Sequence, residues 1–420
     1  MTDEAPGAGG DRRLTTREAA ELLGVKPETV YAYVSRGRLG SRRAPGGRGS
    51  TFDAGEVAAL ARRTGPARPV QRTGTDLSVR TALTLIEADR YYYRGVDAAE
   101  LARDRTYEEV AEWLWTGRLR PGAAFTAPRA AARAARAAVR AMPELSGTTD
   151  LLRVAASAAG AVDPLRFDLS GEAVLATGRG LIPTLVAALP PAGPDQRGEG
   201  PLARRLWSRL TPHPADDGSL RVLDTALALL VDHDLATSTL AVRVAASARA
   251  HVYAAVSTGL GVLDAPLHGA ASGQAHRMLL NVLDEGNAAP VVAEELRAGR
   301  RIPGLGHRVY RGEDPRARVL FALLEQLPQA DSSLAAARDI VRTAARHTGL
   351  HANVDLALAV FTTACGMPPT AGETVFALAR TAGWIAHALE EYAEAPLRMR
   401  PLGDYTGPTP PQPLPAPATD

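Results

Sequence analysis

Three loops in the middle of the chain each carry a histidine, the side chain best suited to proton transfer near neutral pH. The first, VDHDLATST, contains His233, and the second, APLHGAAS, contains His268 just before Gly269. The third, IPGLGHRVYRGEDPRA, contains His307 and ends close to Arg316. The histidines are therefore candidates for hydrogen-bond donors or proton carriers, and the arginine is a candidate for binding an anionic substrate.

Two later segments offer a carboxylate and a second guanidinium. HANVDLALAVF places Asp355 at the entry to an apolar helix, and FALARTAGWIAHALE places Arg380 among hydrophobic residues, where its charge needs a partner. Each feature alone has an ordinary structural explanation, because His-Gly and Asp-Pro pairs are typical of turns and an aspartate after Asn is typical of a helix cap. GLGH is similar to the start of a dinucleotide fingerprint, but Val309 stands where a third glycine would be, which excludes that interpretation.

Together the segments have the order of one known family. The succession DHD, PLHG, PGLGHRVY with DPR, NVD, ART-GW-AH and RP-Y-G resembles the motif set of the citrate synthase family over residues 77–407, and LTLIEADRYYYRGVDAAELARDRTYEEVAEWLWTGRL resembles its amino-terminal segment. The resemblance implies an all-α fold with a large helical domain and a smaller inserted domain at about residues 275–380. It also implies an acyltransferase of the tricarboxylic acid cycle that condenses acetyl-CoA with oxaloacetate to citrate and CoA.

Three positions match the catalytic residues of that family. The resemblance implies that Asp355 is the general base that removes a proton from the acyl-CoA methyl carbon. His268 would hydrogen-bond the thioester oxygen and stabilise the enol or enolate, and His307 would polarise the carbonyl of the oxo acid. A proton next to a thioester is weakly acidic, so its removal needs both a positioned base and a donor at the developing oxyanion.

Four further positions match residues that bind the carboxylates of the oxo acid: His233, Arg316, Arg380 and Arg400. The family sends the arginine that corresponds to Arg400, in RMRP, across a dimer interface into the neighbouring site. The resemblance therefore implies a homodimer with shared active sites, whose partners are an acyl-CoA and a 2-oxo dicarboxylate. The coenzyme A thioester is a substrate, and no cofactor or metal is expected.

Two departures from the family pattern leave alternatives open. The family commonly has Asn where this chain has Ala236, and it usually has Asn where this chain has Ser272. Both positions lie near the catalytic set, so they bear on substrate range and rate. A 2-methylcitrate synthase that uses propionyl-CoA, or a paralogue that keeps the fold and loses activity, would fit the same motifs.

The composition predicts a cytoplasmic protein. The 420 residues include 45% hydrophobic and 22% charged residues, with a formal net charge of +2, which gives no bulk field for nucleic acid or membranes. Cys365 is the only cysteine, which excludes an intrachain disulfide, and no Cys/His set has the spacing of a zinc site. The amino terminus lacks the apolar core of a signal peptide, and no uninterrupted apolar run is long enough to span a membrane.

The amino-terminal segment predicts a separate small domain. REAAELLG and PETVYAYVSRG read as two short helices joined by a tight turn, and residues 14–63 resemble the winged helix-turn-helix domain of the MerR and excisionase families. Four arginines of the second helix and the following loop could contact DNA phosphates: Arg36, Arg38, Arg42 and Arg43. The alternative to an enzyme is thus a DNA-binding regulator with a citrate synthase-like sensor, although such a domain is also used for protein contacts.

These patterns divide the chain into five parts. We expect a disordered tail over 1–12, the helix-turn-helix domain over 13–65, a linker over 66–76, the citrate synthase-like domain over 77–407 and a Pro-rich tail over 408–420. Within the long domain the pattern is almost entirely helical, and strand signals occur only around Leu85 and in the aromatic group Tyr91–Tyr93.

Overall fold

The structure is a computed structural model that describes residues 13–23, 25–35, 37, 39–43, 50–57, 60, 79–87, 89–193, 200–265, 268–269, 271–401, 406–408 and 414. The chain divides into two compact units, Met1–Arg80 and Thr81–Asp420, and each is described by itself. The predicted tail 1–12, the predicted linker 66–76 and nearly all of the predicted tail 408–420 lie outside the described residues.

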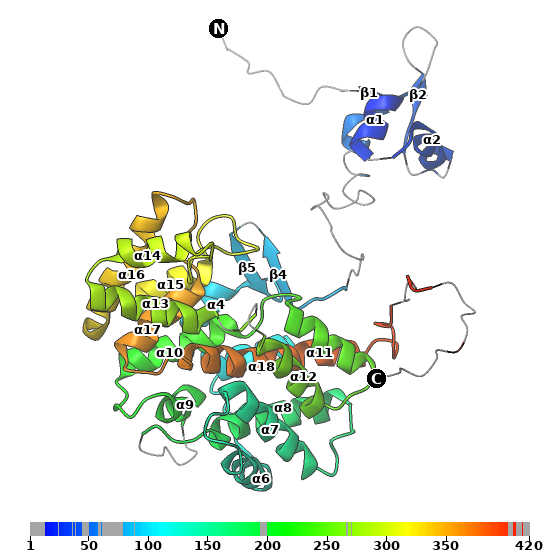
Figure 1. Ribbon diagram of the computed structural model, residues 1–420. Coiled ribbons are helices and arrows are strands. Elements are labelled where there is room, and N and C mark those ends of the chain that lie inside the picture. Colours follow the sequence, from blue (N-terminus) through cyan, green and yellow to red (C-terminus); the bar gives the residue numbers. More distant parts are fainter. Residues whose placement is uncertain are drawn as a thin grey trace, which may run out of the picture. The chain divides into compact units, whose positions relative to one another are not determined.

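Among its described residues, the first unit combines two short helices and a further helical segment at residues 54–57 with a small antiparallel sheet (Figure 1). Its elements are β1 (Arg13–Thr15), α1 (Thr16–Leu23), α2 (Pro27–Ser35), β2 (Arg42–Arg43) and β3 (Ser50–Asp53), and β3 is the central strand of the order β1-β3-β2. The Thr15 hydroxyl accepts a hydrogen bond from the Glu18 amide at 3.3 Å, and the Glu18 carboxylate accepts one from the Thr15 amide at 2.8 Å. This reciprocal cap stabilises the start of α1, which begins one residue before the predicted segment REAAELLG. Strand β1 was not anticipated from the sequence.

The first unit has its own core. Its buried side chains come from both helices and the sheet, and include Leu14, Ala19, Leu23, Val30 and Phe52. Sheet and helices therefore bury one another's apolar faces, which is the layered packing expected of a small independent domain.

The second unit is almost entirely helical, as predicted. It begins with a three-stranded antiparallel sheet made of β4 (Thr84–Glu87), β5 (Arg90–Tyr93) and β6 (Val96–Asp97). The helices that follow are α4 (Ala98–Asp104), α5 (Tyr107–Thr116), α6 (Arg129–Arg140), α7 (Thr148–Ala161), α8 (Gly171–Ala188), α9 (Leu202–Leu210), α10 (Asp217–Leu230), α11 (Thr237–Ser247), α12 (Val252–Leu263), α13 (Ala271–Glu285), α14 (Ala288–Arg297), α15 (Pro315–Leu324), α16 (Asp331–Ala345), α17 (Val354–Ala364) and α18 (Ala371–Tyr392), with one 3-10 turn at Pro328–Ala330.

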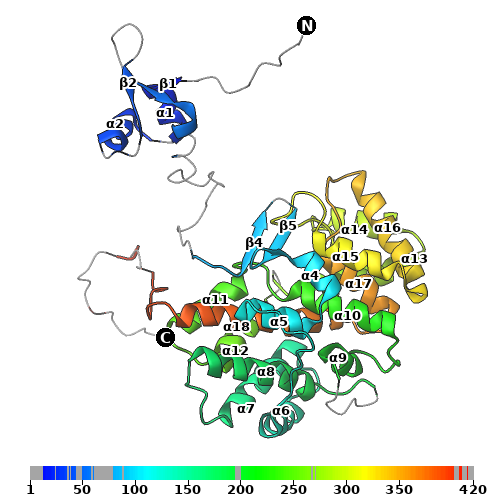
Figure 2. The ribbon, with the colours of Figure 1, turned by 180° about the vertical axis from the view of Figure 1, so that it is seen from behind.

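The 22-residue helix α18 is the central element of this unit. It packs against α5, α7, α8, α10, α11, α12, α13 and α17. Figures 1 and 2 show it crossing the middle of the unit, with α6, α7, α8 and α9 on one side and α13 to α17 grouped on the other. That group occupies the region of the predicted inserted domain, and its movement as a separate domain stays a prediction.

The short sheet presents two tyrosines to the helical core. Residues Thr84–Glu87 pair antiparallel with Arg90–Tyr93, so alternate residues of β5 share one face, and Tyr91 and Tyr93 are both buried. The strand signals around Leu85 and Tyr91–Tyr93 are therefore confirmed. In the part of the chain that is described, no helix is both long and apolar enough to cross a membrane.

Candidate functional site

The loop that carries His307 is held against the start of α17. Gly304 and Gly306 have φ values of +79° and +77°, a conformation that glycine adopts without strain, and a Cβ on Gly304 would lie 2.8 Å from the Cβ of Leu356. Gly306 donates its amide to the His351 carbonyl at 2.7 Å, and the Asn353 amide donates to the Gly304 carbonyl at 3.0 Å. The glycines of PGLGH thus allow the loop to lie directly on the segment before Asp355.

Asn353 connects this loop to α17. Its side-chain oxygen accepts the amides of Asp355 at 2.9 Å and Leu356 at 3.4 Å, which caps the helix, and its Nδ2 donates to the Gly306 carbonyl at 2.8 Å. The cap is therefore Asn353 and not Asp355. Within the described chain the Asp355 carboxylate makes no hydrogen bond, so it is available as a base.

The environment of Asp355 favours its neutral form. Burial raises the pKa of this carboxyl from 3.8 to about 6, against the opposing influence of Arg316, and Asp314 raises it further. A carboxylate with a pKa near 6 is ionised at neutral pH and is a better proton acceptor than an ordinary aspartate.

Asp314 and Arg316 form a buried ion pair at the start of α15. Asp314 caps the helix and binds the Arg316 guanidinium through two hydrogen bonds of 3.0 and 2.8 Å. It also accepts the Val354 amide at 3.0 Å, which ties α15 to α17. The two side chains are 1% and 3% exposed, and although burial opposes ionisation, the pKa of Asp314 is lowered because Arg316 lies beside it. The DPR segment is thus a helix start rather than a simple turn.

His307 lies beside this pair as a neutral ring. Its Nδ1 accepts the Val309 amide at 3.0 Å, and its Nε2 lies 3.2 Å from Nη2 of Arg316. Burial, reinforced by the Arg316 charge, lowers the pKa of His307 to about 4. With Nδ1 accepting the Val309 amide, the neutral ring carries its proton on Nε2, which then faces the Arg316 guanidinium without a hydrogen bond because both groups are donors. The Nε2–H group of His307 and the guanidinium of Arg316 are then two hydrogen-bond donors side by side, which together could bind an oxygen acceptor.

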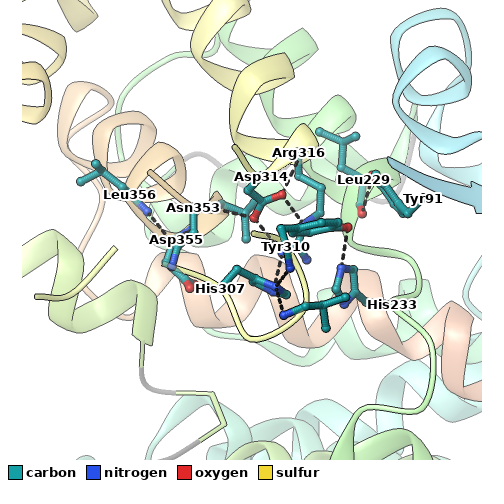
Figure 3. A network of polar contacts seen from close by, with 12 residues as sticks. Tyr91, Leu229, His233, His307, Tyr310, Asp314, Arg316, Asn353, Asp355 and Leu356 are labelled. Carbon is teal, nitrogen blue, oxygen red and sulfur yellow. Dashed lines mark hydrogen bonds and ion pairs between the residues drawn. The ribbon is translucent and has the colours of Figure 1, made fainter. Parts of the chain in front are cut away.

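Tyr310 joins His307 to His233. Its hydroxyl lies 2.8 Å from Nε2 of His233, and its ring centroid lies 4.7 Å from that of His307. Figure 3 shows Tyr310 between the two imidazoles, with Arg316 close to the group and Asp355 beyond His307. Burial, followed by the charges of Arg316 and Arg380, holds the pKa of His233 well below its ordinary value. Both imidazoles are therefore neutral donors or acceptors at physiological pH.

Arg380 lies in the middle of α18 and is 1% exposed. Its Nε donates to the Leu230 carbonyl at 3.0 Å, and its guanidinium lies 4.6 Å from the centroid of Phe376. Burial lowers the pKa of Arg380, although the charge of Asp232 opposes this shift. The expectation that this guanidinium needs partners is confirmed, and one of them is the backbone just before the His233 loop.

His268 follows α12 and is held by Ser238. Its Nε2 lies 2.8 Å from the Ser238 hydroxyl, and burial together with the charge of Arg380 lowers its pKa. The charge of Arg380 lowers the pKa of both His268 and His233, so both loops lie within electrostatic reach of this guanidinium.

Arg400 does not join this cluster. Its amide donates to the Leu397 carbonyl, whereas its side chain is exposed and has no polar contact with any described residue. In the first unit, Arg42 and Arg43 are exposed on β2, and Arg36 and Arg38 lie outside the described residues.

Sequence reasoning missed the side chains that hold the catalytic candidates in place: Tyr310, Ser238, Asp314 and Asn353. Local signals existed for two of them, because an Asp before Pro-Arg and an Asn directly before an apolar helix are both typical N-caps. No local signal marks Tyr310 or Ser238, whose partners lie 77 and 30 residues away in the chain.

One departure from the family pattern leaves a helix without a cap. Ala236 is the N-cap of α11, with φ −56° and ψ 158°, and it supplies no side-chain hydrogen bond. We expect Ala236→Ser to raise the free energy of unfolding by about 0.5–2 kcal/mol, because its hydroxyl can accept an amide of the first turn. Thermal unfolding checks this. Ala236→Val, which adds apolar volume but no acceptor, should give no gain, and an equal gain with Val would contradict the capping explanation.

The other departure buries a hydroxyl without a partner. Ser272 is 4% exposed, and its Oγ has no hydrogen-bond partner among the described residues. It lies against Gly372, where a Cβ would overlap the Ser272 hydroxyl. An Asn at position 272 would therefore need more space at the start of α18 than this chain provides.

Profiles of two protein families match the chain. The citrate synthase C-terminal domain matches residues 74–402, and a helix-turn-helix domain matches residues 13–64. A citrate synthase of Haloferax volcanii is 31% identical over 357 residues, which cover 79% of this chain and 94% of that protein. A 2-methylcitrate synthase of Corynebacterium glutamicum is 26% identical over 344 residues, which cover 76% of this chain and 90% of that protein.

A solved structure shares the fold. The ternary complex of Thermoplasma acidophilum citrate synthase with carboxymethyl coenzyme A and oxaloacetate has a TM-score of 0.65 and covers 81% of this chain and 97% of its own. Its sequence identity is 22%, a level at which the likeness supports the fold alone. The curated relatives include both a citrate synthase and a 2-methylcitrate synthase, so the comparisons do not distinguish acetyl-CoA from propionyl-CoA as the substrate.

Proposed function

Because this chain belongs to the citrate synthase family of acyltransferases, we propose that it condenses acetyl-CoA with oxaloacetate and releases citrate and CoA. One observation carries the proposal: the carboxylate of Asp355, with its pKa raised to about 6, lies close to the neutral His307 and the buried Arg316. A base, a neutral donor and a fixed cation are what this condensation requires. The Thermoplasma relative binds a CoA analogue and oxaloacetate, which supports the same substrate pair here.

The acyl-CoA half of the reaction falls to Asp355 and His268. Asp355 takes a proton from the methyl carbon of the thioester, and electron density moves onto the thioester oxygen. With the Ser238 hydroxyl donating to Nε2 of His268, the neutral ring carries its proton on Nδ1 and donates it to that oxygen. Because His268 and His307 both act as neutral donors, the site avoids the free-energy cost of burying an additional cation.

The oxo-acid half falls to His307 and the cationic residues. The Nε2–H of His307 donates to the oxo oxygen, which makes the carbon it is bonded to more electrophilic. The enolate carbon attacks that carbon and forms the new C–C bond, and hydrolysis of the resulting thioester releases CoA. Arg316 and Arg380 bind the carboxylates, with His233 as a further donor.

Arg400 completes the site of a second copy in this proposal. Its exposed side chain has no polar partner among the described residues, and its position matches the arginine that the family exchanges between subunits. A homodimer with two shared sites follows from this placement. The dimer also brings two amino-terminal units together, as many DNA-binding proteins require.

The test is release of free CoA by the purified full-length protein, followed with a thiol reagent. Acetyl-CoA plus oxaloacetate should release CoA at a rate proportional to enzyme, and omission of oxaloacetate should abolish the release. A higher kcat/KM with propionyl-CoA would instead identify a 2-methylcitrate synthase. No release with either thioester would contradict the enzyme proposal and leave a regulator that uses the fold as a sensor.

DNA binding by the first unit is the second candidate function, favoured by the exposed pair Arg42 and Arg43 on the edge strand β2. We expect Arg42→Ala/Arg43→Ala to weaken binding to a promoter fragment and to lower the slope of log K against log salt by about 2, roughly one unit per phosphate contact. Retention measured over a salt series checks this. Arg346→Ala, an exposed arginine of the second unit, is the control, and an unchanged slope in the double variant would contradict the assignment.

A further inference from the structure

A network of buried charged side chains runs through the second unit from the His233 loop to the carboxy-terminal segment. It contains Asp232, His387, Arg243, Glu391 and Arg398. The first four side chains are at most 1% exposed. They come from the loop after α10, from α18 and from α11, which Figures 1 and 2 both show lying side by side with α18.

From Arg243 to His387 and from His387 to Asp232, each hydrogen bond is donated toward the loop that carries His233. Arg243 donates to Nδ1 of His387 at 3.0 Å, so a proton of this ring lies on Nε2 and is donated to Oδ2 of Asp232, 3.3 Å away. The same nitrogen, Nη1, also binds Glu390 at 2.6 Å, and Nε of Arg243 binds Glu391 at 3.2 Å. No residue of this network could be replaced alone without leaving a buried charge or hydrogen-bond donor unpaired.

Stability alone does not account for the network. Replacing a buried ion network with well-packed apolar side chains is often neutral or stabilising, because desolvation cancels much of the Coulomb attraction. Such a network does, however, allow only one arrangement of the segments that it joins. The function of the network is therefore indicated by the segments that it holds in place at its two ends.

At the near end the network fixes the loop that carries His233. The Asp232 side chain accepts the Thr84 hydroxyl at 2.5 Å, and the Asp232 carbonyl accepts the Tyr93 hydroxyl at 3.1 Å. A Cβ on Gly383 would overlap the Val231 carbonyl, so α18 lies directly against this loop. Asp234, on the far side of His233, has a φ of +56°, a conformation that the surrounding contacts must maintain.

At the far end the network fixes the segment that carries Arg400. Arg398 binds both oxygens of Glu391, at 2.9 and 2.6 Å. Leu397, with a φ of +59°, donates its amide to the Ser247 carbonyl at 2.8 Å. The Met399 amide lies 3.4 Å from the Ser247 hydroxyl. The backbone on the amino-terminal side of Arg400 is thus tied to α11 and α18 while its own side chain stays free.

We propose that this network is a positioning device with two outputs: Asp232 and His387 hold the His233 loop for the site of their own subunit, and Glu391 and Arg398 hold Arg400 for the site of a second copy. The proposal rests on the proposed function, in which both ends bind the same oxo dicarboxylate. The two outputs act on different sites, so one network contributes to both active sites of a dimer.

The near end is tested by His387→Leu, which keeps side-chain volume and removes both hydrogen bonds. It should raise the KM for oxaloacetate at least about tenfold and leave the KM for acetyl-CoA within about twofold. His387→Gln, whose amide can replace both hydrogen bonds, should return the KM for oxaloacetate most of the way to the wild-type value. His276→Leu is the matched control, because His276 is 2% exposed and bonded to Thr362 on α17. Equal effects of the two Leu variants on the KM for oxaloacetate would overturn the positioning role.

The far end is tested with mixed dimers that carry two affinity tags, one on each chain. Arg398→Gln alone should raise the KM for oxaloacetate. In a mixed dimer with Asp355→Ala, the only site with a base belongs to the Arg398→Gln chain and receives Arg400 from a chain whose Arg398 is intact. The KM should then return to the wild-type value, whereas the His387→Leu chain in the same pairing should keep its raised KM. A raised KM for both pairings would overturn the division into two outputs.

A reference pairing separates this inference from the proposed function. Arg400→Ala and Asp355→Ala should each be inactive, but their mixed dimer contains one complete site. An unsorted equal mixture should therefore regain about a quarter of wild-type activity. No recovery would show that Arg400 does not serve the second copy, and absence of CoA release by the wild-type protein would contradict the proposed reaction itself.

Discussion

Replacing Asp355 by Asn is expected to lower kcat for CoA release by roughly 10²–10⁴-fold, the usual contribution of a positioned general base. The amide fills the same space and cannot accept the proton of the thioester methyl group. Asn353 caps α17 through its own side chain, so the helix keeps its start in the variant. Steady-state release of CoA at saturating substrate concentrations gives the measurement.

The same substitution should not destabilise the protein. The folded-state pKa of Asp355 is about 6, above its ordinary value of 3.8, so the native state holds the proton more tightly than the unfolded state. Stability therefore falls as the pH rises between these two values, and Asn removes that loss. Thermal unfolding at pH 7 should show Asp355→Asn to be at least as stable as wild type.

A matched variant isolates the chemistry. Asp331→Asn changes an exposed aspartate in the first turn of α16 and should leave kcat unchanged. In the wild-type enzyme, kcat for the proton-removal step should rise with pH up to about 6 and then level off, since the base must be ionised. Full activity of Asp355→Asn, or an equal loss in Asp331→Asn, would rule out Asp355 as the base.

Arg316→Met is expected to abolish binding of the oxo acid and to lower the free energy of unfolding by about 3–5 kcal/mol, because breaking a buried pair leaves a charge without its partner. The stranded group is Asp314, which is 1% exposed. Chemical denaturation and oxaloacetate-dependent thermal shift give the two measurements.

A double variant separates the two effects. Asp314→Asn/Arg316→Met removes both charges, and the single side-chain oxygen of Asn can still cap α15, although the Val354 amide, which bonds the other oxygen of Asp314, loses its acceptor. Most of the lost stability should return, and oxaloacetate binding should not. Recovery of binding together with stability would mean that Arg316 acts only by supporting the fold.

Much of the helical fold could be predicted from the sequence because its signals are local. The two short helices of the first unit and the periodicity of the long helices depend on residues within one or two turns of one another. The same holds for PGLGH, where positive φ values at Gly304 and Gly306 require glycine. The order of the motifs then indicated the family, although no motif alone did so.

The partners of the catalytic candidates were decided only by the tertiary structure. Tyr310 meets His233 across 77 residues of chain, and Arg380 meets the Leu230 carbonyl across 150. Asp355 has its raised pKa because packing removes water from around it, which no spacing of residues reveals. Likewise, Asp232 and His387 are ordinary residues in their own segments, and only the packing of α18 on the His233 loop buries them together. The sequence by itself thus determined the helices, the turns and the kinds of reactive group. Burial and long-range contact, which depend on how the helices pack, decided which groups are neutral, which are paired and which are free to act.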